Sequence, residues 1–432
     1  MKKSITQALN IIRQERLFSS IYIIGTGLSI TMVMSLSIVF YLKIADIYPE
    51  TNRSRMLLVK SGTEKAADGG FYASSLALHT IETCFNNIEN VEAITAIHQT
   101  WNDGCYIQLP NSKEQPPVTV KYIDDNFWTV FPFHYIEGKP FTKEDFRSSL
   151  PVAVITRSLA NKIFGTTDVV GREVSMNFRN FRICGIVRDA SFITERTFAH
   201  IYLPYTVLPN WEHAAAPEKT LGAYQACILA RTASDIPKIK QTILENVSKY
   251  NQTLKAEFSI VGQPDSQWQS TFRLGGNHAP DFTKIIIQYT LIFFILLLVP
   301  AVSLSGMTES RMERRMEEMG VRRAFGAPAG NIIRQVLTEN LVFTAFGGAL
   351  GLIFSYIIII LGRNWIMQTG SNFGNIPPEG VDTAISPSML INLPVFSIAL
   401  AVCILLNLLS AFIPAWRAAR RPIVYSLNPT EN

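Results

Sequence analysis

The sequence predicts an α-helical membrane protein with four transmembrane helices and a large α+β extracytoplasmic domain inserted between the first two helices. Composition is the first reason, because 48% of the 432 residues are hydrophobic and only 17% are charged, which is unusual for a soluble enzyme. The second reason is a set of four long segments without any charged residue. The third reason is the distribution of Lys and Arg around those segments.

Each uncharged segment exceeds the roughly 20 residues that a helix needs to cross a bilayer. The segments lie between Arg16 and Lys43, Lys284 and Glu309, Glu339 and Arg363, and Asp382 and Arg417. At this length a membrane span is a better interpretation than a buried core helix. The first segment is also too long for the ~7–15 apolar residues of a signal peptide, so we interpret it as an uncleaved anchor.

The basic residues predict the orientation of the chain in the membrane. They cluster before the first span, between the second and third spans, and after the fourth: Lys2, Lys3, Arg13 and Arg16; six arginines in 309–340; and Arg417, Arg420 and Arg421. By the positive-inside rule both termini are cytoplasmic in the inner (plasma) membrane. The net charge of +5 is therefore a topology signal, and no nucleic-acid partner is predicted.

These observations divide the chain into nine predicted segments. They are a cytoplasmic amphipathic helix (1–17), transmembrane helix 1 (18–43), the extracytoplasmic domain (44–283), helix 2 (284–308), a cytoplasmic helix-turn-helix (309–338), helix 3 (339–362), a short outer loop (363–389), helix 4 (390–415) and a cytoplasmic tail (416–432). For residues 1–17, simple flanking of the anchor is an equally good interpretation.

The region 44–283 contains the periodicities of a folded α+β domain. A strand at 152–154 precedes a helix at 157–164, which Gly165 ends in a left-handed conformation. Residues 181–188 alternate between apolar and polar positions, as in a strand with one buried face. Ile236, Ile239, Ile243 and Val247 share one face of a further helix.

The cytoplasmic stretch 309–340 contains more than a topology signal. Met312, Met316 and Met319 form an apolar stripe on a charged helix, which suits a docking surface for a partner. Gly326, followed by Ala327 and Pro328, is expected to end this helix at positive φ, and Asn331 is expected to cap the next one. The alternative is a charged loop that only obeys the positive-inside rule, but that rule requires neither the stripe nor the glycine.

Two weaker features lie inside the spans. Gly347 and Gly351 form a G-x-x-x-G pattern, which allows close helix packing either within one subunit or between two. Pro300 is expected to kink the second span. No continuous row of polar or ionisable residues lines the spans, so a substrate tunnel through the bilayer is not predicted.

Neither catalytic nor metal-binding motifs are found. The six histidines are scattered without metal-ligand spacing. Cys84, Cys105, Cys184 and Cys227 lie in the outer region, where disulfides are permitted but the spacing fixes no pairing, and Cys403 lies in the fourth span. We therefore predict a non-catalytic subunit without a cofactor or metal of its own.

Several stretches together resemble a known family. The segments "DNFWTVFPFHYIEGKPFTKEDF", "PVAVITRSLANKIFG", "DVVGREVSMNFRNFRICGIVRDA" and "IYLP" look like the extracytoplasmic core domain of MacB-type ABC transporter permeases. The segment "MEEMGVRRAFGAPAGNIIRQVLTENLVFTAFGGALGLIFS" resembles the FtsX-type permease signature, and "IPAWRAARRPIVYSLNP" is similar to its ending. The resemblance covers nearly the whole chain and implies four membrane helices with the outer domain between the first two.

The resemblance also implies partners and a coupling element. Family members commonly form dimers, with a second copy or a paralogous permease, and bind ATP-hydrolysing subunits on the cytoplasmic side. No G-x-x-x-x-G-K-[ST] phosphate loop occurs in the sequence, so we expect ATP to be bound by a separate ABC ATPase subunit. The residues expected to couple to it are Met312, Arg315, Met316, Met319, Gly320, Arg322, Arg323, Gly326 and Ala327.

The predicted function is that of a permease subunit in an ABC-type export or mechanotransmission system. Closure of the ATPase would move spans one and two and, through them, the outer domain; membrane lipids and a periplasmic adaptor or outer-membrane component are further expected partners. The alternative is a non-transporting regulator that activates a cell-wall hydrolase or senses an antimicrobial peptide. A static anchor is a third hypothesis, for which the cytoplasmic element would be superfluous. Neighbouring genes would discriminate among these.

Overall fold

The computed structural model describes residues 14, 16–66, 69–99, 105–109, 114–273, 275, 278–314, 321, 324–368 and 393–420. The chain forms two compact units. One consists of the described residues within Met1–Phe40, Thr283–Ile366 and Ser386–Asn432, and the other of those within Tyr41–Phe282 and Met367–Ile385. We call them the helical unit and the outer domain.

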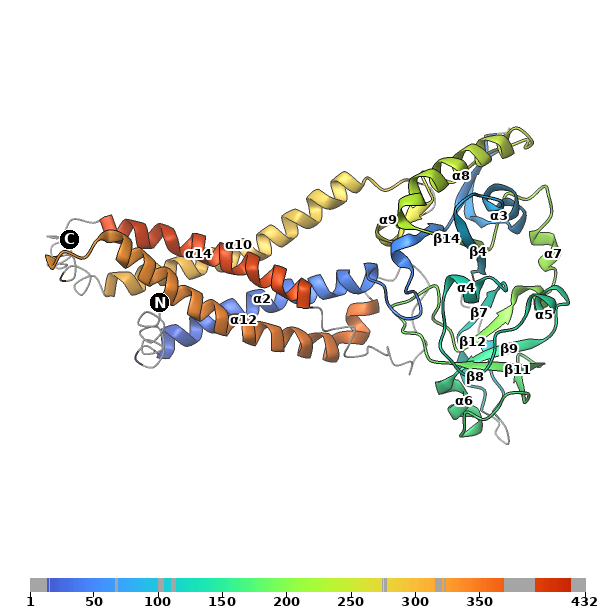
Figure 1. Cartoon of the computed structure of the whole chain (residues 1–432), viewed down its shortest axis with the longest axis horizontal. Helices are drawn as coiled ribbons and strands as arrows, with labels where there is room; N and C mark the ends of the chain where they lie inside the picture. Colours follow the sequence, from blue (N-terminus) through green and yellow to red (C-terminus); the bar gives the residue numbers. More distant parts are fainter. Residues whose placement is uncertain are drawn as a thin grey trace. The chain divides into compact units, whose positions relative to one another are not determined.

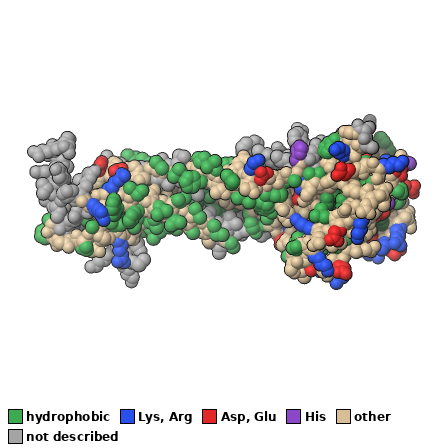
Figure 2. Space-filling view, turned by 90° about the horizontal axis from the view of Figure 1, so that it is seen from above, with side chains coloured by type: hydrophobic (Ala, Val, Ile, Leu, Met, Phe, Trp, Pro, Cys, Tyr) green, Lys and Arg blue, Asp and Glu red, His purple; other side chains and the backbone are tan. Residues whose placement is uncertain are grey.

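The helical unit is built from four long helices (Figure 1). They are α2 (Arg16–Ile44), α10 (Phe282–Arg314), α12 (Ala329–Gln368) and α14 (Leu393–Arg420). Large apolar side chains cover the outside of this unit (Figure 2). This arrangement suits a lipid environment, since apolar side chains are stable against hydrocarbon.

Three of the helices in the described part of the chain are long and apolar enough to cross a membrane. The candidate spans are Ser19–Ile44, Ala329–Gly362 and Phe396–Arg417, while α10 contains a shorter apolar stretch, Phe282–Leu296. The chain is therefore a membrane-embedded protein. The count of four spanning helices, the cytoplasmic orientation of the termini and the domain boundaries stay predictions.

Contacts within the helical unit define the directions of its helices. Tyr22 of α2 contacts Phe343 of α12, with ring centroids 5.4 Å apart, and Gly27, further along α2, lies against Gly347 and Gly351. The positions increase together along both helices, so α2 and α12 run parallel. The positions in α14 decrease instead, because Asn407 contacts Thr344 and Leu400 contacts Gly348. The helix α14 is therefore antiparallel to α12.

The outer domain is a mixed α+β fold whose strands have the following bounds. They are β1 (Met56–Val59), β2 (Gly62–Lys65), β3 (Phe71–Leu76), β4 (Val91–His98), β5 (Cys105–Tyr106), β6 (Pro117–Val118), β7 (Val120–Ile123), β8 (Tyr135–Gly138), β9 (Val152–Thr156), β10 (Glu173–Met176), β11 (Arg179–Val187), β12 (Ile201–Pro204), β13 (Leu221–Gly222), β14 (Tyr224–Ala230), β15 (Glu257–Ser259) and β16 (Asp265–Ser266). Its helices are α3 (Leu78–Phe85), α4 (Phe127–Val130), α5 (Lys143–Arg147), α6 (Arg157–Phe164), α7 (Trp211–Ala214), α8 (Ile236–Asn251) and α9 (Gln267–Phe272), with short 3₁₀ turns at Arg53–Arg55, Tyr205–Val207 and Ala233–Asp235.

Among the described residues, all strands except β5 and β6 join one sheet with the central order β10-β11-β9-β12-β7-β4-β14-β3-β2-β15. Most pairs are antiparallel, whereas β11 with β9 and β12 with β7 are parallel. Three apolar clusters form the cores: one joins α3 and α8 to β14, one centres on Phe127, and one joins α6 to β9 and β11.

Several local predictions for the outer domain are confirmed. The strand β9 is followed by α6, which ends at Gly165 with φ +70°. In β11 the side chains of Phe181 and Ile183 are buried while Arg182 between them is exposed. The helix α8 buries Ile239, Ile243 and Val247, as the 3.6-residue period predicts.

One local prediction is wrong. Asn331 does not cap the helix that follows Gly326, because α12 already begins at Ala329. Pro328, directly before it, has a fixed φ that suits the start of a helix and lacks the N–H that a first turn leaves unpaired. The predicted positive φ at Gly326 is confirmed, with φ +90°.

Candidate functional site

A buried ion pair holds the chain where it leaves α2 and enters the outer domain. Glu50 and Arg53 are 0% and 2% exposed, and Arg53 Nε lies 2.8 Å from Glu50 Oε2. Arg53 also donates through Nη1 to the backbone oxygens of Leu42 at 3.1 Å and Ala45 at 2.7 Å. The carbonyls at the end of a helix have no partner within the helix and carry partial negative charge. Arg53 therefore fixes the end of α2 to the loop that follows it.

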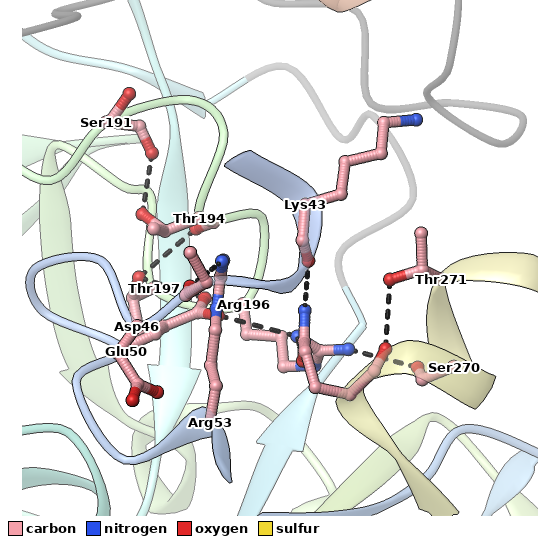
Figure 3. A network of polar contacts seen from close by, with 12 residues as sticks. Lys43, Asp46, Glu50, Arg53, Ser191, Thr194, Arg196, Thr197, Ser270 and Thr271 are labelled. Carbon is pink, nitrogen blue, oxygen red and sulfur yellow. Dashed lines mark hydrogen bonds and ion pairs between the residues drawn. The ribbon is translucent and has the colours of Figure 1, made fainter. Parts of the chain in front are cut away.

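Arg196 connects this ion pair to α9 (Figure 3). It lies in the connection between β11 and β12 and donates to Glu50 Oε2 at 3.4 Å, Gln267 Oε1 at 3.0 Å and Ser270 Oγ at 3.0 Å. Thr197, next to it, donates to Glu50 Oε1 at 3.2 Å. The carboxylate of Glu50 is thus shared by groups from two parts of the chain that are far apart in sequence.

The short helix α9 contacts the segments that lead into both neighbouring membrane helices. Gln267 Nε2 donates to the backbone oxygen of Lys43, near the end of α2, at 2.7 Å. The ring of Trp268 lies 5.2 Å from the ring of Phe282, the first residue of α10. Lys43 and Phe282 both belong to the outer domain, so two adjacent residues of α9 contact the segments at which this domain begins and ends.

A second buried ion pair follows α9. Arg273 and Asp265 are each 2% exposed, and Arg273 Nη2 donates to Asp265 Oδ1 at 3.0 Å. Arg273 Nη1 also donates to the oxygen of His278 at 3.2 Å, on the way to α10. We call the residues of these contacts the linker junction: Lys43, Glu50, Arg53, Arg196, Asp265, Gln267, Trp268, Ser270, Arg273 and Phe282.

The electrostatics of the linker junction favour charged, paired side chains. Burial by itself raises the pKa of Glu50, but the charges of Arg53 and Arg196 and their hydrogen bonds outweigh burial, so its pKa lies below the ordinary value. Lys60, beside the linker junction, differs from Glu50, because burial disfavours its charged form and lowers its pKa to about 8. Its Nζ donates to the oxygen of Ser270 at 2.9 Å. Such a network holds segments together but contains no nucleophile and base arranged for catalysis.

The predicted coupling residues are described only in part. Arg315, Met316, Met319, Gly320, Arg322 and Arg323 lie outside the described residues. Met312 is buried at 4% exposure, Gly326 is exposed, and Ala327 is half-buried. Phe325, which the sequence analysis did not select, is 88% exposed directly before Gly326. The sequence could have pointed to Phe325, because it is an aromatic residue directly before Gly326, the glycine expected to end the charged helix.

The two glycines predicted for helix packing lie against α2 of the same chain. A Cβ on Gly351 would lie 2.8 Å from Gly27 O and Ile30 Cβ, and one on Gly347 would lie 2.8 Å from Thr26 Cβ. Thr31 Oγ1 also donates to Gly351 O at 3.2 Å. Of the two alternatives, these contacts favour packing within one subunit. Position 300 lies inside α10, and the kink at Pro300 stays a prediction.

The described residues contain no group of three His, Cys, Asp or Glu side chains that could hold a metal ion. Cys84, Cys105, Cys184, Cys227 and Cys403 form no disulfide bond in the described part of the chain.

Comparison with known families assigns both parts of the chain. Residues 19–246 match the MacB-like periplasmic core domain, and residues 290–423 match the FtsX-like permease C-terminal family. The chain therefore belongs to the MacB/FtsX-type ABC transporter permeases. The resemblance inferred from the sequence is thereby confirmed.

Curated relatives are similar over parts of their length. The chain is 22% identical to the uncharacterized ABC transporter permease YknZ of Bacillus subtilis over 273 residues, which cover 63% of this chain and 65% of that protein. It is 26% identical to the macrolide export ATP-binding/permease protein MacB of Mannheimia succiniciproducens, covering 55% of this chain and 35% of the relative. For the pyoverdine export ATP-binding/permease protein PvdT of Pseudomonas entomophila, the identity is 24% over 70% of this chain and 42% of the relative. The chain thus spans less than two thirds of the length of these relatives.

Two solved structures are also similar. The extracellular domain of YknZ matches 42% of this chain and 87% of its own, at 17% identity and a TM-score of 0.33. A domain of a putative permease protein from Porphyromonas gingivalis matches 49% of this chain and 90% of its own, at 18% identity and a TM-score of 0.37.

Proposed function

We propose that this chain is the non-catalytic membrane subunit of an ABC-type system, which converts ATP-driven closure of a separate ATPase subunit into movement of its outer domain. ATP would be bound by the partner, and the chain itself would need no cofactor. The single observation that carries the proposal is the contact of α9 with both the end of α2 and the beginning of α10. A static anchor does not require that one helix, α9, contact both the segment that enters the outer domain from α2 and the segment that leaves it toward α10.

The mechanism follows from the strength of these contacts. A displacement of α2 along its axis acts on the Arg53 hydrogen bonds to the oxygen of Leu42, in the last turn of α2, and to the oxygen of Ala45, directly after it. Arg53 is paired with Glu50, and Glu50 with Arg196 of the β11–β12 connection. Separating buried, paired charges costs several kcal/mol, so the segments would move together rather than slip. Export or mechanical regulation of a partner outside the membrane would both use this movement.

The cytoplasmic input would enter at the turn between α10 and α12. Phe325 is 88% exposed, and its N–H donates to the oxygen of Val321 at 3.1 Å. An exposed aromatic ring is the kind of side chain that anchors a protein interface. We therefore include Phe325 with Met316 in the proposed docking surface for the ATPase.

The test uses the full-length chain expressed together with the ABC ATPase encoded nearest to it. Phe325→Asp should reduce both the amount of ATPase that co-purifies and the permease-dependent part of ATP turnover, because a carboxylate would be buried at the interface without a partner. Phe178→Asp is the matched control, since Phe178 is 94% exposed in the outer domain and its replacement should change neither quantity.

Transmission is measured separately by hydrogen exchange. With wild-type protein, trapping the ATPase with ATP should change amide protection in 41–53 and 267–273. Phe325→Asp should abolish that change. Unchanged co-purification and turnover in Phe325→Asp would remove the turn from the docking surface. No nucleotide-dependent change at the linker junction in the wild type would refute the proposed transmission.

A further inference from the structure

The interface between α12 and α14 contains a polar site with two positions one helical turn apart. Asn407 of α14 donates through Nδ2 to Thr344 Oγ1 of α12 at 3.2 Å, and Thr344 Oγ1 donates to the backbone oxygen of Asn340 at 2.8 Å. The exposed fractions of Asn340, Thr344 and Asn407 are 1%, 1% and 6%. Asn340 and Thr344 are four residues apart, so their side chains lie on the same face of α12.

The side chain of Asn340 is unsatisfied. Neither its Nδ2 nor its Oδ1 has a hydrogen-bond partner within the described part of the chain. A buried amide without a partner is strongly unfavourable, and such groups in native proteins require an explanation. The amide of Asn407 could pair with Asn340, and it lies one helical turn away, where it donates to Thr344.

We propose that α14 slides by one helical turn along α12 during the transport cycle, so that Asn407 exchanges Thr344 for Asn340. This inference deepens the proposed function and depends on it. One turn corresponds to about 5.4 Å along the axis, and one-turn shifts between packed helices are a known kind of switching transition. Because the two helices are antiparallel, the slide moves α14 toward its own C-terminal end and toward the N-terminal end of α12, where the cytoplasmic turn lies.

The neighbouring contacts fit two discrete positions. Ser305 of α10 donates to Ser410 O of α14 at 3.0 Å, so a slide of α14 either breaks this hydrogen bond or takes α10 with it. Leu400 lies so close to Gly348 that a Cβ there would meet its Cδ1 at 2.6 Å. In the proposed slide Leu400 leaves this contact and moves one turn along α12 toward Thr344, so the close contact at Gly348 belongs to the position that the structure shows.

Cysteine pairs test the slide directly in the full-length chain with its ATPase, in a Cys403→Ala background. The pair Thr344→Cys with Asn407→Cys should form a disulfide in the nucleotide-free state. The pair Asn340→Cys with Asn407→Cys should form one after ATP trapping, with a change of about tenfold in each linked fraction, because a 5.4 Å displacement exceeds the range of Cα separations that a disulfide tolerates. Tyr22→Cys with Phe343→Cys is the control, since α2 and α12 are not proposed to slide.

Single substitutions distinguish the slide from a purely structural role of Asn340. Asn340→Leu should raise the melting temperature of the nucleotide-free protein, because it removes an unsatisfied amide, yet reduce permease-dependent ATP turnover about tenfold, the equivalent of one buried hydrogen bond. Asn340→Ser, whose hydroxyl can accept from Asn407, should restore turnover. If a bound water satisfies Asn340 instead, Asn340→Leu will lower the melting temperature and leave turnover unchanged, which overturns the proposal.

The outcomes also separate this proposal from the proposed function. Wild-type stimulation of the ATPase without nucleotide-dependent linking of positions 340 and 407 overturns the slide alone. Absence of any ATPase binding or stimulation by the wild-type chain overturns both.

Discussion

Replacing Glu50 by glutamine keeps the shape of a fully buried side chain but removes the negative charge that faces Arg53 and Arg196. Breaking a buried ion pair by removing one partner costs about 3–5 kcal/mol, since the remaining charge stays buried without compensation. For a domain of this size, each kcal/mol lowers the melting temperature by roughly 2–4 °C. We therefore expect Glu50→Gln to lower the melting temperature of the outer domain by about 6–20 °C.

The matched control is Glu92→Gln. Glu92 pairs with Arg55 in the same domain, but the side chains of Arg55 and Glu92 are 27% and 41% exposed. Exposed pairs contribute about 0–1 kcal/mol, so this variant should melt within about 4 °C of the wild type. Thermal unfolding of the full-length protein in detergent, followed by near-UV circular dichroism, measures both. Equal shifts for the two variants would refute the view that the linker junction depends on a buried charge.

The pH dependence of stability supplies a second measurement on the same residue. The pKa of Glu50 is lowered in the folded state, so its stabilisation is fully present above the unfolded-state pKa of about 4.3 and is lost as the pH falls through the lower folded-state value. The difference in melting temperature between wild type and Glu50→Gln should therefore be constant from neutral pH down to about 5 and decrease at more acidic pH. A difference that already disappears between pH 7 and 5 would contradict this assignment.

Three further predictions concern the membrane part of the chain. Gly351→Ala should lower the melting temperature of the helical unit, because the added Cβ would lie 2.8 Å from Gly27 O. Gly306→Ala should not, since an added Cβ there meets no atom of another helix within 4 Å in the described part of the chain. Equal effects of the two substitutions would exclude close α2–α12 packing. Cysteine labelling in intact cells should find Ser112 and Asn210 outside and Arg314 and Thr430 inside, and labelling of position 314 from outside would overturn the topology. Met316→Asp and Gly326→Val should each reduce co-purification of the ATPase without affecting membrane insertion; for Gly326→Val the reason is that valine is strained at φ +90°. If both variants co-purify normally with the ATPase, the arginine-rich loop is a topology signal and not a docking surface.

The sequence alone determined the class of the protein and most of its local structure. Long uncharged segments predict membrane helices because burying charge in hydrocarbon is costly, and this reasoning needs no tertiary contact. The end of α6 at Gly165, the buried face of α8 and the positive φ of Gly326 follow from local backbone and periodicity rules. The motifs of the MacB and FtsX families were likewise continuous stretches of sequence.

Only the tertiary structure decided which residues act together. Glu50, Arg196 and Gln267 are separated by long stretches of sequence and form one network because the sheet places the β11–β12 connection beside α9 and the end of α2. The partners of Gly347 and Gly351, which the sequence left open, depend on which helix lies opposite. The cap predicted at Asn331 was wrong because Pro328 starts the helix earlier. The unsatisfied amide of Asn340 could not be inferred from its sequence at all, since burial and hydrogen bonding are set by neighbours that only folding brings together.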